Sequence, residues 1–261
     1  MDNKLTVPLS IVVAGALIAG AIFLTNKDTG GNVAVNNTQQ QKIQKTAMAI
    51  RPINVQEHLL GNPNAPLVVV EFSDTECPFC KNFHTTMHKA IEEYGKEGEV
   101  AWAYRHFPID QLHPKARKES EATECAADLG GNAKFWEYTD LLYKTTPSNN
   151  LLDAKELPVI AVKVGLDVNA FNTCLSNGKY AEKVETDYQE AISAGGRGTP
   201  FSIIVSKKKL NSKAEELFNQ LAAQLPANTI VISEDKFRVS VSGALPYDLL
   251  SGIFDIILGK N

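Results

Sequence analysis

The chain has 261 residues and a formal charge of −4 at pH 7, with 44% hydrophobic and 21% charged residues. These values are ordinary for a globular protein, and the length suits one well-filled domain with tails or two small domains. A net negative charge provides no broad cationic surface, so we expect no nucleic-acid partner. Four cysteines are too few to form a disulfide scaffold at this length.

The N-terminal segment has the character of a membrane span. Residues 5–24 carry no charge, and residues 11–24 are all apolar or glycine. Twenty helical residues at about 1.5 Å each cross the roughly 30 Å hydrocarbon core of a bilayer. We interpret residues 1–25 as an uncleaved transmembrane signal anchor, because no small-residue cleavage motif follows the apolar run. A cleaved signal peptide is the alternative. Either interpretation exports the rest of the chain, to the periplasm or the cell exterior.

The next part of the chain changes from tether to folded domain. Residues 26–49 are rich in Asn, Gln, Gly and Thr and predict a flexible tether, so we assign the folded domain to residues 50–261. A Val-rich run at residues 67–72, bounded by turn residues, is typical of a buried central strand. The other predicted elements are a helix at about 78–94, a strand at 100–107, helices within 113–193 broken at Gly130-Gly131, strands at 201–205, 229–233 and 237–241, and a final helix at 247–258.

An extra segment at about residues 207–228 separates two of the predicted strands. It begins with a basic, polar stretch and continues as a short amphipathic helix at residues 214–225, with Leu217, Leu221 and Leu225 on one stripe. We interpret the segment as a surface decoration on a hairpin; a partner-docking element is the alternative.

The motif Cys77-Pro78-Phe79-Cys80 lies where the first strand turns into a helix. With Cys77 as the N-cap, Pro78 occupies the first helical position, where its missing N–H costs nothing. The free amides of Phe79 and Cys80, together with the helix dipole, then favour the Cys77 thiolate over the thiol. Cys80, one turn into the helix, is expected to be more buried and to resolve a mixed disulfide formed by Cys77. The acidic residues just before Cys77 oppose this stabilisation.

The same cysteines could instead belong to a zinc site. His84 and His88 extend the spacing to C-x2-C-x3-H-x3-H, and Cys80, His84 and His88 recur every four residues on one helix face. Structural zinc sites usually draw ligands from two separate segments, whereas this set lies within a single helix start. We therefore expect no metal at these residues. His84, one turn after Cys80, is instead a candidate to tune the dithiol.

Four motifs resemble the DsbA-like branch of the thioredoxin superfamily and follow that family's order. They are VVVEFSDTECPFC at residues 68–80, YRHFP at 104–108, GTP at 198–200 and GALPY at 243–247. The resemblance covers roughly residues 52–258. It implies an α/β, thioredoxin-like fold with an inserted helical domain at about residues 112–194, which agrees with the predicted order of elements.

The resemblance also implies roles for individual residues. Cys77 would be the nucleophile and Cys80 the resolving thiol. Pro200 would form a cis peptide bond facing the dithiol, and Thr199 would offer backbone hydrogen bonds to an extended substrate segment. Without the resemblance, Pro200 could simply end a glycine loop. The pair Pro78-Phe79 would tune the dithiol, but it lacks the histidine that strong oxidases of this family often hold there.

Glu71 lies inside the otherwise apolar strand, six residues before Cys77. It is either an edge carboxylate in solvent or a buried acid near the dithiol that exchanges a proton with Cys80. We favour the second interpretation, because members of the resembled family often carry an acid at this place.

Cys125 and Cys174 lie in two separate helical segments and have no partner cysteine close in sequence. In an oxidising compartment two such thiols most often pair, so we expect a structural disulfide; two free buried thiols are the alternative.

The sequence therefore predicts a thiol–disulfide oxidoreductase that introduces disulfides into exported proteins. Its expected partners are unfolded or extended substrate proteins, a membrane redox partner that reoxidises the dithiol, and the membrane itself through the N-terminal helix. We expect a monomer with no cofactor beyond the Cys77–Cys80 disulfide. The alternatives are a disulfide isomerase or reductase, or a non-enzymatic membrane-bound holdase or docking protein in which the CxxC is structural.

Overall fold

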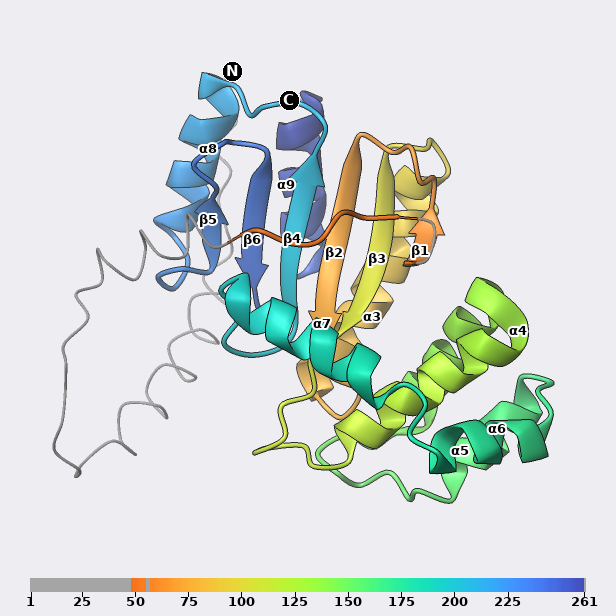
Figure 1. Cartoon of the computed structure of the whole chain (residues 1–261). Coiled ribbons are helices and arrows are strands. Elements are labelled where there is room, and N and C mark those ends of the chain that lie inside the picture. The colour runs from red at the N-terminus through yellow and green to blue at the C-terminus, as the bar shows by residue number, and fades with distance from the viewer. Residues whose placement is uncertain (1–47, 55–56, 261) are drawn as a thin grey trace, which may run out of the picture.

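A mixed six-stranded sheet forms the centre of the molecule in the computed structural model, which describes residues 48–54 and 57–260 (Figure 1). The strand order is β1-β3-β2-β4-β6-β5. β2 and β3 pair in parallel, and every other neighbouring pair is antiparallel. The strands are β1 (His58–Gly61), β2 (Leu67–Ser73), β3 (Val100–His106), β4 (Phe201–Ser206), β5 (Ile230–Ile232) and β6 (Arg238–Ser242).

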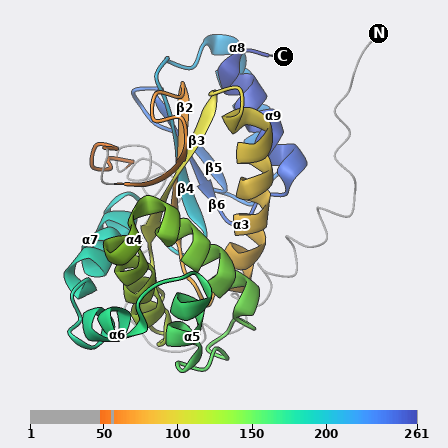
Figure 2. The ribbon, with the colours of Figure 1, turned by 90° about the vertical axis from the view of Figure 1, so that its right-hand side faces the viewer.

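Helices cover both faces of this sheet and form a separate unit at its lower end (Figure 2). α3 and α9 lie on one side of the sheet, α7 lies on the other, and α4, α5 and α6 pack together below. This arrangement confirms the predicted α/β fold with a helical insertion. The helices are α3 (Pro78–Ala90), its π-helical continuation Ile91–Gly95, α4 (Ala116–Thr145), α5 (Glu156–Lys163), α6 (Val168–Ser176), α7 (Ala181–Ser193), α8 (Ser212–Ala222) and α9 (Tyr247–Leu258).

The central strand β2 explains why the sheet is covered twice. Every residue of β2 is buried, as expected of a strand packed on both faces. Leu67 and Val69 point to the face that also holds Phe83 of α3 and Phe254 of α9. Val68, Val70 and Phe72 point the other way, towards Ala191 of α7 and towards Met48. The apolar run therefore fixes the position of β2, and with it the start of α3.

The helical insertion has a core of its own. Tyr138 and Leu142 of α4 pack there against Ile160 of α5 and Phe171 of α6. α4 changes direction at Gly131, which has φ 75° and ψ −170°, close to the predicted break at Gly130-Gly131. Only glycine takes up such a conformation without a steric cost, and the kink carries the chain back towards the sheet.

Three features differ from the sequence interpretation. β1 was not predicted; it is a short edge strand that pairs antiparallel with β3. Met48, which we placed in the tether, is only 1% exposed and packs against the sheet, so the packed chain begins before residue 50. The buried side of α8 is formed by Ala214 and Phe218 with Leu221 beside them, while Leu217 lies off this stripe.

The extra segment adds α8 and the edge strand β5. β4 and β6 pair directly, as the predicted hairpin requires, and β5 then extends the sheet beyond β6. The predicted anchor at residues 1–25 and nearly all of the predicted tether lie outside the described residues. Within residues 48–54 and 57–260, no helix has the length and apolar character needed to cross a membrane.

Candidate active site

The two cysteines of the CxxC motif occupy the start of α3, directly after β2. Cys77 is the N-cap residue in extended conformation, and Pro78 is the first residue of the helix. Cys77 is 5% exposed, whereas Cys80 is fully buried. Both are free thiols. Cys77 thus keeps a small exposed fraction, whereas Cys80 keeps none.

The Thr199–Pro200 peptide bond is cis and faces Cys77 across 122 residues of sequence. The Sγ atom of Cys77 lies 3.5 Å from the Thr199 carbonyl oxygen. This contact follows from the sheet register, because Phe201 of β4 pairs with Phe72 at the end of β2. Antiparallel pairing thus brings the start of one strand beside the end of the other, where the dithiol lies.

The two thiols have opposite acidities. A hydrogen bond from Cys80 is the largest influence on Cys77, and with Thr199 and the amides of Phe79 and Cys80 it outweighs burial and lowers the pKa of Cys77 to about 6. Burial is the main reason why the pKa of Cys80 is raised well above its usual value, and the neighbouring Cys77 adds to this effect. At neutral pH Cys77 is therefore mostly thiolate and Cys80 is thiol.

The acidic residues before Cys77, which we expected to oppose the thiolate, are both fully buried and bonded. The Oδ2 atom of Asp74 accepts hydrogen bonds from the Ile109 amide at 2.8 Å and from Nδ1 of His113 at 3.0 Å. The pKa of His113 is raised, chiefly by this bond to Asp74, which favours the protonated imidazole beside the carboxylate. The Asp74 amide lies 3.4 Å from the Cys80 sulfur.

Glu76 is held by a loop of the helical insertion. The Asn149 amide donates to the Glu76 carbonyl at 2.8 Å, and the Asn150 amide donates to its carboxylate at 2.6 Å. Ser148, Asn149 and Asn150 all have positive φ, between 55° and 66°, a conformation in which Asn is enriched. Successive left-handed residues turn their amides towards one point, which here is Glu76.

Glu119 of α4 completes this buried group of acids. Its carboxylate accepts a hydrogen bond from the Thr75 hydroxyl at 2.7 Å. Burial first, and then a hydrogen bond shared with Glu76, raise the pKa of Glu119 to about 8. Glu119 therefore holds a proton at neutral pH, and this limits the negative charge near Cys77.

Glu71 is fully buried on the face of β2 that packs with the dithiol. Neither of its carboxylate oxygens has a hydrogen-bond partner among the described residues. Burial raises the pKa of Glu71 to about 8, with the polar groups of Ser73 and Trp102 opposing weakly. The side chain is therefore buried and largely protonated at neutral pH, and it does not lie at a solvent-exposed edge.

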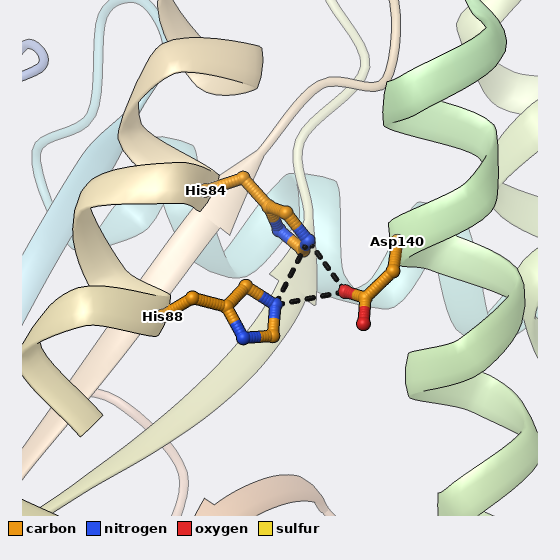
Figure 3. A group of neighbouring side chains, drawn as sticks. All are labelled: His84, His88 and Asp140. Atoms are coloured by element: carbon orange, nitrogen blue, oxygen red, sulfur yellow. Dashed lines mark hydrogen bonds and ion pairs between the residues drawn. The ribbon is translucent and has the colours of Figure 1, made fainter. Parts of the chain in front are cut away.

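His84 lies one turn after Cys80, and its ring points towards His88 and Asp140 (Figure 3). Its Nε2 atom contacts Oδ1 of Asp140 at 2.7 Å, and its buried Nδ1 atom has no partner among the described residues. Burial lowers the pKa of His84. Neither ring nitrogen of His84 bonds a cysteine. The His84 ring instead lies 4.6 Å from that of Tyr143.

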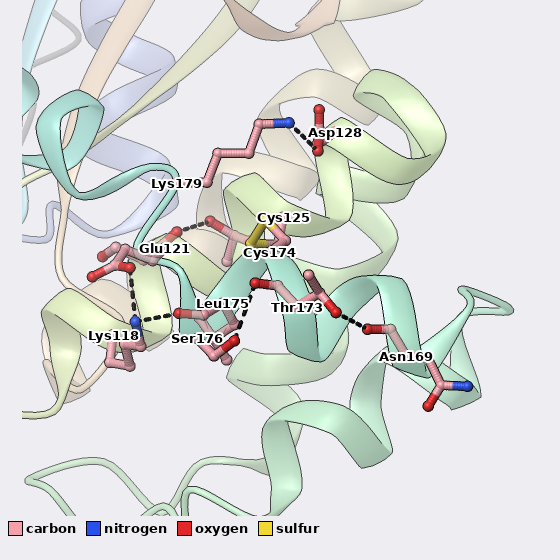
Figure 4. The surroundings of a disulfide bond; sticks show 12 residues. Lys118, Glu121, Cys125, Asp128, Asn169, Thr173, Cys174, Leu175, Ser176 and Lys179 are labelled. Atoms are coloured by element: carbon pink, nitrogen blue, oxygen red, sulfur yellow. Dashed lines mark hydrogen bonds and ion pairs between the residues drawn. A yellow bond between two sulfur atoms is a disulfide. The ribbon is translucent and has the colours of Figure 1, made fainter.

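Cys125 of α4 and Cys174 of α6 are joined by a disulfide within the helical insertion (Figure 4). Both are buried in the core formed by α4, α5 and α6. The bond lies away from the CxxC motif. It connects two helices through cysteines that are 49 residues apart in sequence.

Several residues of this site carry too little local signal to be found from the sequence. The hydrogen bond between Thr75 and Glu119 joins residues 44 positions apart. The bond between Glu76 and Asn150 joins residues 74 positions apart. Tyr143 of α4 reaches the end of β2, where its hydroxyl bonds Ser73 at 2.9 Å. The Asn-rich residues 148–150 indicate only a turn, and the carboxylate that this turn binds depends on how the insertion folds back.

Residues 53–223 match the thioredoxin family. The chain belongs to this family. Among solved structures it is similar to α-DsbA1 of Wolbachia pipientis, with a TM-score of 0.62 and 22% identity over 82% of this chain and 97% of that one. It is also similar to oxidised BdbD of Bacillus subtilis, with a TM-score of 0.54 and 22% identity over 69% of this chain and 98% of that one. At 22% identity, the similarity to these two structures establishes the fold alone.

Curated relatives of this thioredoxin-family chain include sodium/proton antiporters. It is 30% identical over 162 residues to the Na(+)/H(+) antiporter NhaA 1 of Mycolicibacterium gilvum, which is 61% of this chain and 25% of that protein. A similar match, 31% over 144 residues, is found with NhaA 3 of Salinispora tropica, covering 55% of this chain and 21% of that protein. The chain spans about a quarter of the length of these relatives, whose names describe sodium/proton exchange.

Proposed function

We propose that the protein is a thiol–disulfide oxidoreductase that introduces disulfides into exported proteins. The observation that carries the proposal is the asymmetry of the dithiol. Cys77 is 5% exposed and its pKa is lowered to about 6, whereas Cys80 is fully buried and the pKa of its thiol is raised. A stabilised thiolate is a good leaving group, so the Cys77–Cys80 disulfide is easily reduced and tends to oxidise other thiols.

In the proposed reaction, a substrate thiolate attacks the Cys77 sulfur of the Cys77–Cys80 disulfide. The bond between the two cysteines breaks, and Cys80 leaves as a thiolate that takes up a proton. The second substrate thiolate then attacks the substrate sulfur of the mixed disulfide, and Cys77 leaves as a thiolate. The substrate loses two electrons, and the protein gains them as a dithiol.

Glu71 is proposed to exchange the proton with Cys80. It is the acid on the same buried face, it carries a proton at neutral pH, and no hydrogen bond within the described structure holds it elsewhere. A buried thiolate that forms in an apolar core needs a nearby proton donor, because water cannot reach it.

The surface around Cys77 supports an extended, apolar substrate. Phe79 is 51% exposed, and Leu112 and Leu151 are 66% and 67% exposed. Asn150, which precedes Leu151, bonds the Leu112 carbonyl and the carboxylate of Glu76, the residue before Cys77. Exposed apolar side chains around a reactive group are typical of a surface that binds unfolded protein. The Thr199 backbone beside Cys77 offers hydrogen bonds to such a segment.

Donation of disulfides is favoured over isomerisation or reduction. The lowered pKa of Cys77 stabilises the reduced dithiol, so the Cys77–Cys80 disulfide tends to accept electrons from substrate thiols. A catalytic cycle then requires a membrane redox partner that accepts two electrons from the dithiol. We propose that the protein acts as a monomer, anchored by its N-terminus with the domain outside the cytoplasm. A membrane-bound holdase with a structural CxxC is the second candidate, and the exposed apolar residues around Cys77 are the observation that favours it.

Trapping of mixed disulfides tests the proposal. The oxidised protein should oxidise a reduced, unfolded model protein. Cys80→Ala, offered a model protein that carries a disulfide, should accumulate a mixed disulfide, because the Cys77 thiolate displaces one substrate thiolate and no Cys80 thiol resolves the product. Cys77→Ser should form no such adduct, because Cys80 is inaccessible. Equal adduct yields through Cys80 would reverse the assigned roles. Binding of the unfolded protein without any change in its thiol content would favour the holdase.

A further inference from the structure

A group of metal-binding side chains lies between the active-site helix and the helical insertion (Figure 3). His84 and His88 come from α3, one turn apart, and Asp140 comes from α4. Among the described residues, they are the group of three His, Cys, Asp or Glu side chains whose ligand atoms converge. Cys80, which the sequence pattern placed with the two histidines, is not a member.

The three ligand atoms point at one another. Oδ1 of Asp140 lies 2.7 Å from Nε2 of His84 and 2.8 Å from Nε2 of His88. The two Nε2 atoms are 3.2 Å apart. If both imidazoles donate to the carboxylate, their N–H groups crowd each other and the contact between the nitrogens is no hydrogen bond. A cation at the common point would instead satisfy all three lone pairs.

The spacing also fits a small divalent ion. Tetrahedral zinc has bonds of about 2.0–2.1 Å to imidazole nitrogen and carboxylate oxygen, which separates neighbouring ligand atoms by about 3.4 Å. The observed separations of 2.7–3.2 Å reach this value with small side-chain rotations.

Surrounding groups hold the two imidazoles in place. The Trp102 ring lies 5.2 Å from the His84 ring and 5.4 Å from the His88 ring, and the Trp136 ring lies 6.4 Å and 6.2 Å from them. Both tryptophans are buried. Rings fixed by packing lose little freedom when an ion binds, so the ligand set is preorganised.

The cluster opens to solvent on one side. The side chain of His84 is only 6% exposed, but those of His88 and Asp140 are 37% and 45% exposed. An ion can therefore enter past His88 and Asp140, and water can complete its coordination.

We propose that His84, His88 and Asp140 bind one divalent transition metal ion of the zinc type, which clamps α3 to α4. Two imidazoles and one carboxylate suit zinc and its neighbours in the first transition row, and they suit magnesium or calcium poorly. The ion would join the helix that carries the dithiol to the helical insertion. This site is separate from the dithiol, and the proposal does not depend on disulfide exchange.

Zinc binding to the oxidised full chain tests the proposal, because a Cys77–Cys80 disulfide cannot ligate metal. Chain produced without a polyhistidine tag and stripped with chelator is dialysed against buffered zinc, and bound zinc is measured by elemental analysis. We expect one zinc per chain. The temperature of unfolding should rise with zinc concentration, since an ion that binds only the folded state stabilises it.

His88→Ala and Asp140→Ala should bind zinc at least about tenfold more weakly, because even outer-shell changes cost 10- to 100-fold. Asp128→Ala is the matched control, because Asp128 is an exposed aspartate elsewhere on α4 that pairs with Lys179. It should bind zinc as the wild type does.

Cobalt gives a readout that needs no variant. The oxidised wild-type chain with Co²⁺ should show visible d–d bands without the near-ultraviolet band of a thiolate ligand. Three outcomes overturn the proposal: no zinc uptake by the oxidised chain, uptake only after reduction of the dithiol, or equal uptake by His88→Ala, Asp140→Ala and the wild type.

Discussion

At the scale of single residues, the site depends on how each ionisable group is surrounded. Cys77 and Cys80 are three positions apart on one helix, yet the pKa of the first is lowered and that of the second is raised. Cys77 lies at the N-terminus of α3, where amides and a neighbouring thiol stabilise the thiolate. Cys80 faces the apolar core, where a charge is unfavourable.

The acidity of Cys77 can be measured by alkylation. The rate at which iodoacetamide labels the reduced protein should rise with pH with a midpoint at about 6, compared with about 8.5 for an unperturbed thiol. Cys77→Ser should remain unlabelled between pH 5 and pH 8, because Cys80 is buried and protonated. A midpoint near 8 in the wild type would contradict the stabilised thiolate.

Glu71 should make stability depend on pH. Its pKa is raised to about 8 in the folded protein, so between pH 4.5 and pH 8 the folded state holds a proton that the unfolded state has released. Stability therefore falls as the pH rises through this window, by on the order of 1 kcal/mol per pH unit. Glu71→Gln, which cannot ionise, should lose less stability from pH 5 to pH 8 than the wild type.

Urea unfolding of the oxidised protein at several pH values measures this difference, because the disulfide keeps Cys77 and Cys80 from titrating. Glu119, whose pKa is also raised to about 8, contributes in the same direction, so the Glu71→Gln curve should be flatter but still sloped. Glu216→Gln, at an exposed position on α8, is the control. Parallel curves for Glu71→Gln and the wild type would show that Glu71 is ionised in the folded state.

At the scale of elements, the sheet and the helical insertion have different sources of stability. The strands are held by the apolar residues on both faces of β2, whereas α4, α5 and α6 form a smaller core of their own. A smaller core buries less apolar area, so a covalent link between its helices contributes proportionately more.

Removal of the Cys125–Cys174 disulfide should destabilise the protein without abolishing exchange. Closing a loop with a sequence separation of 49 stabilises by about 4 kcal/mol in the chain-entropy model. Cys125→Ala with Cys174→Ala should lower the urea midpoint accordingly, while the oxidation of a model substrate at 25 °C remains measurable. An unchanged midpoint, or two free thiols in protein purified from an oxidising compartment, would rule out a structural role.

At the scale of the whole molecule, the site is assembled from both units of the fold. β2 and α3 supply the dithiol, the loop before β4 supplies Thr199 and Pro200, and the insertion supplies Glu119 and the loop at residues 148–150. The exposed apolar residues proposed to bind substrate likewise come from both units, Phe79 from α3 and Leu112 and Leu151 from the insertion.

This surface should matter for protein substrates and not for small ones. Phe79→Ser and Leu151→Ser should lower kcat/KM for an unfolded protein by about tenfold, which corresponds to about 1.4 kcal/mol of lost apolar contact. Their reaction with glutathione disulfide should change little. Val162→Ser is the control, because Val162 is 56% exposed on α5. Equal losses with the protein and with glutathione disulfide would show that Phe79 acts on the dithiol and not on substrate binding.

The family, the fold and the pair of cysteines could be predicted from the sequence because they depend on local patterns. The Val-rich run predicts β2, Pro78 predicts the start of α3, and Cys-Pro-Phe-Cys at that junction places one sulfur at a helix N-terminus. Each of these features is set by residues within a few positions of one another. Local patterns failed where the signal was short, as for β1 and for Met48, which packs against the sheet.

The protonation states and the partners of single residues were decided only by the tertiary structure. The sequence presents Asp74 and Glu76 as charges that oppose the Cys77 thiolate. In the structure, His113 bonds Asp74 from 39 positions away. Glu119, 43 positions from Glu76, lies beside it with its pKa raised to about 8. Sequence also grouped His84 and His88 with Cys80 on one helix face, whereas the structure turns them to Asp140 on α4. Burial and ion pairing depend on which segments meet in space, and the folding back of the insertion determines that meeting.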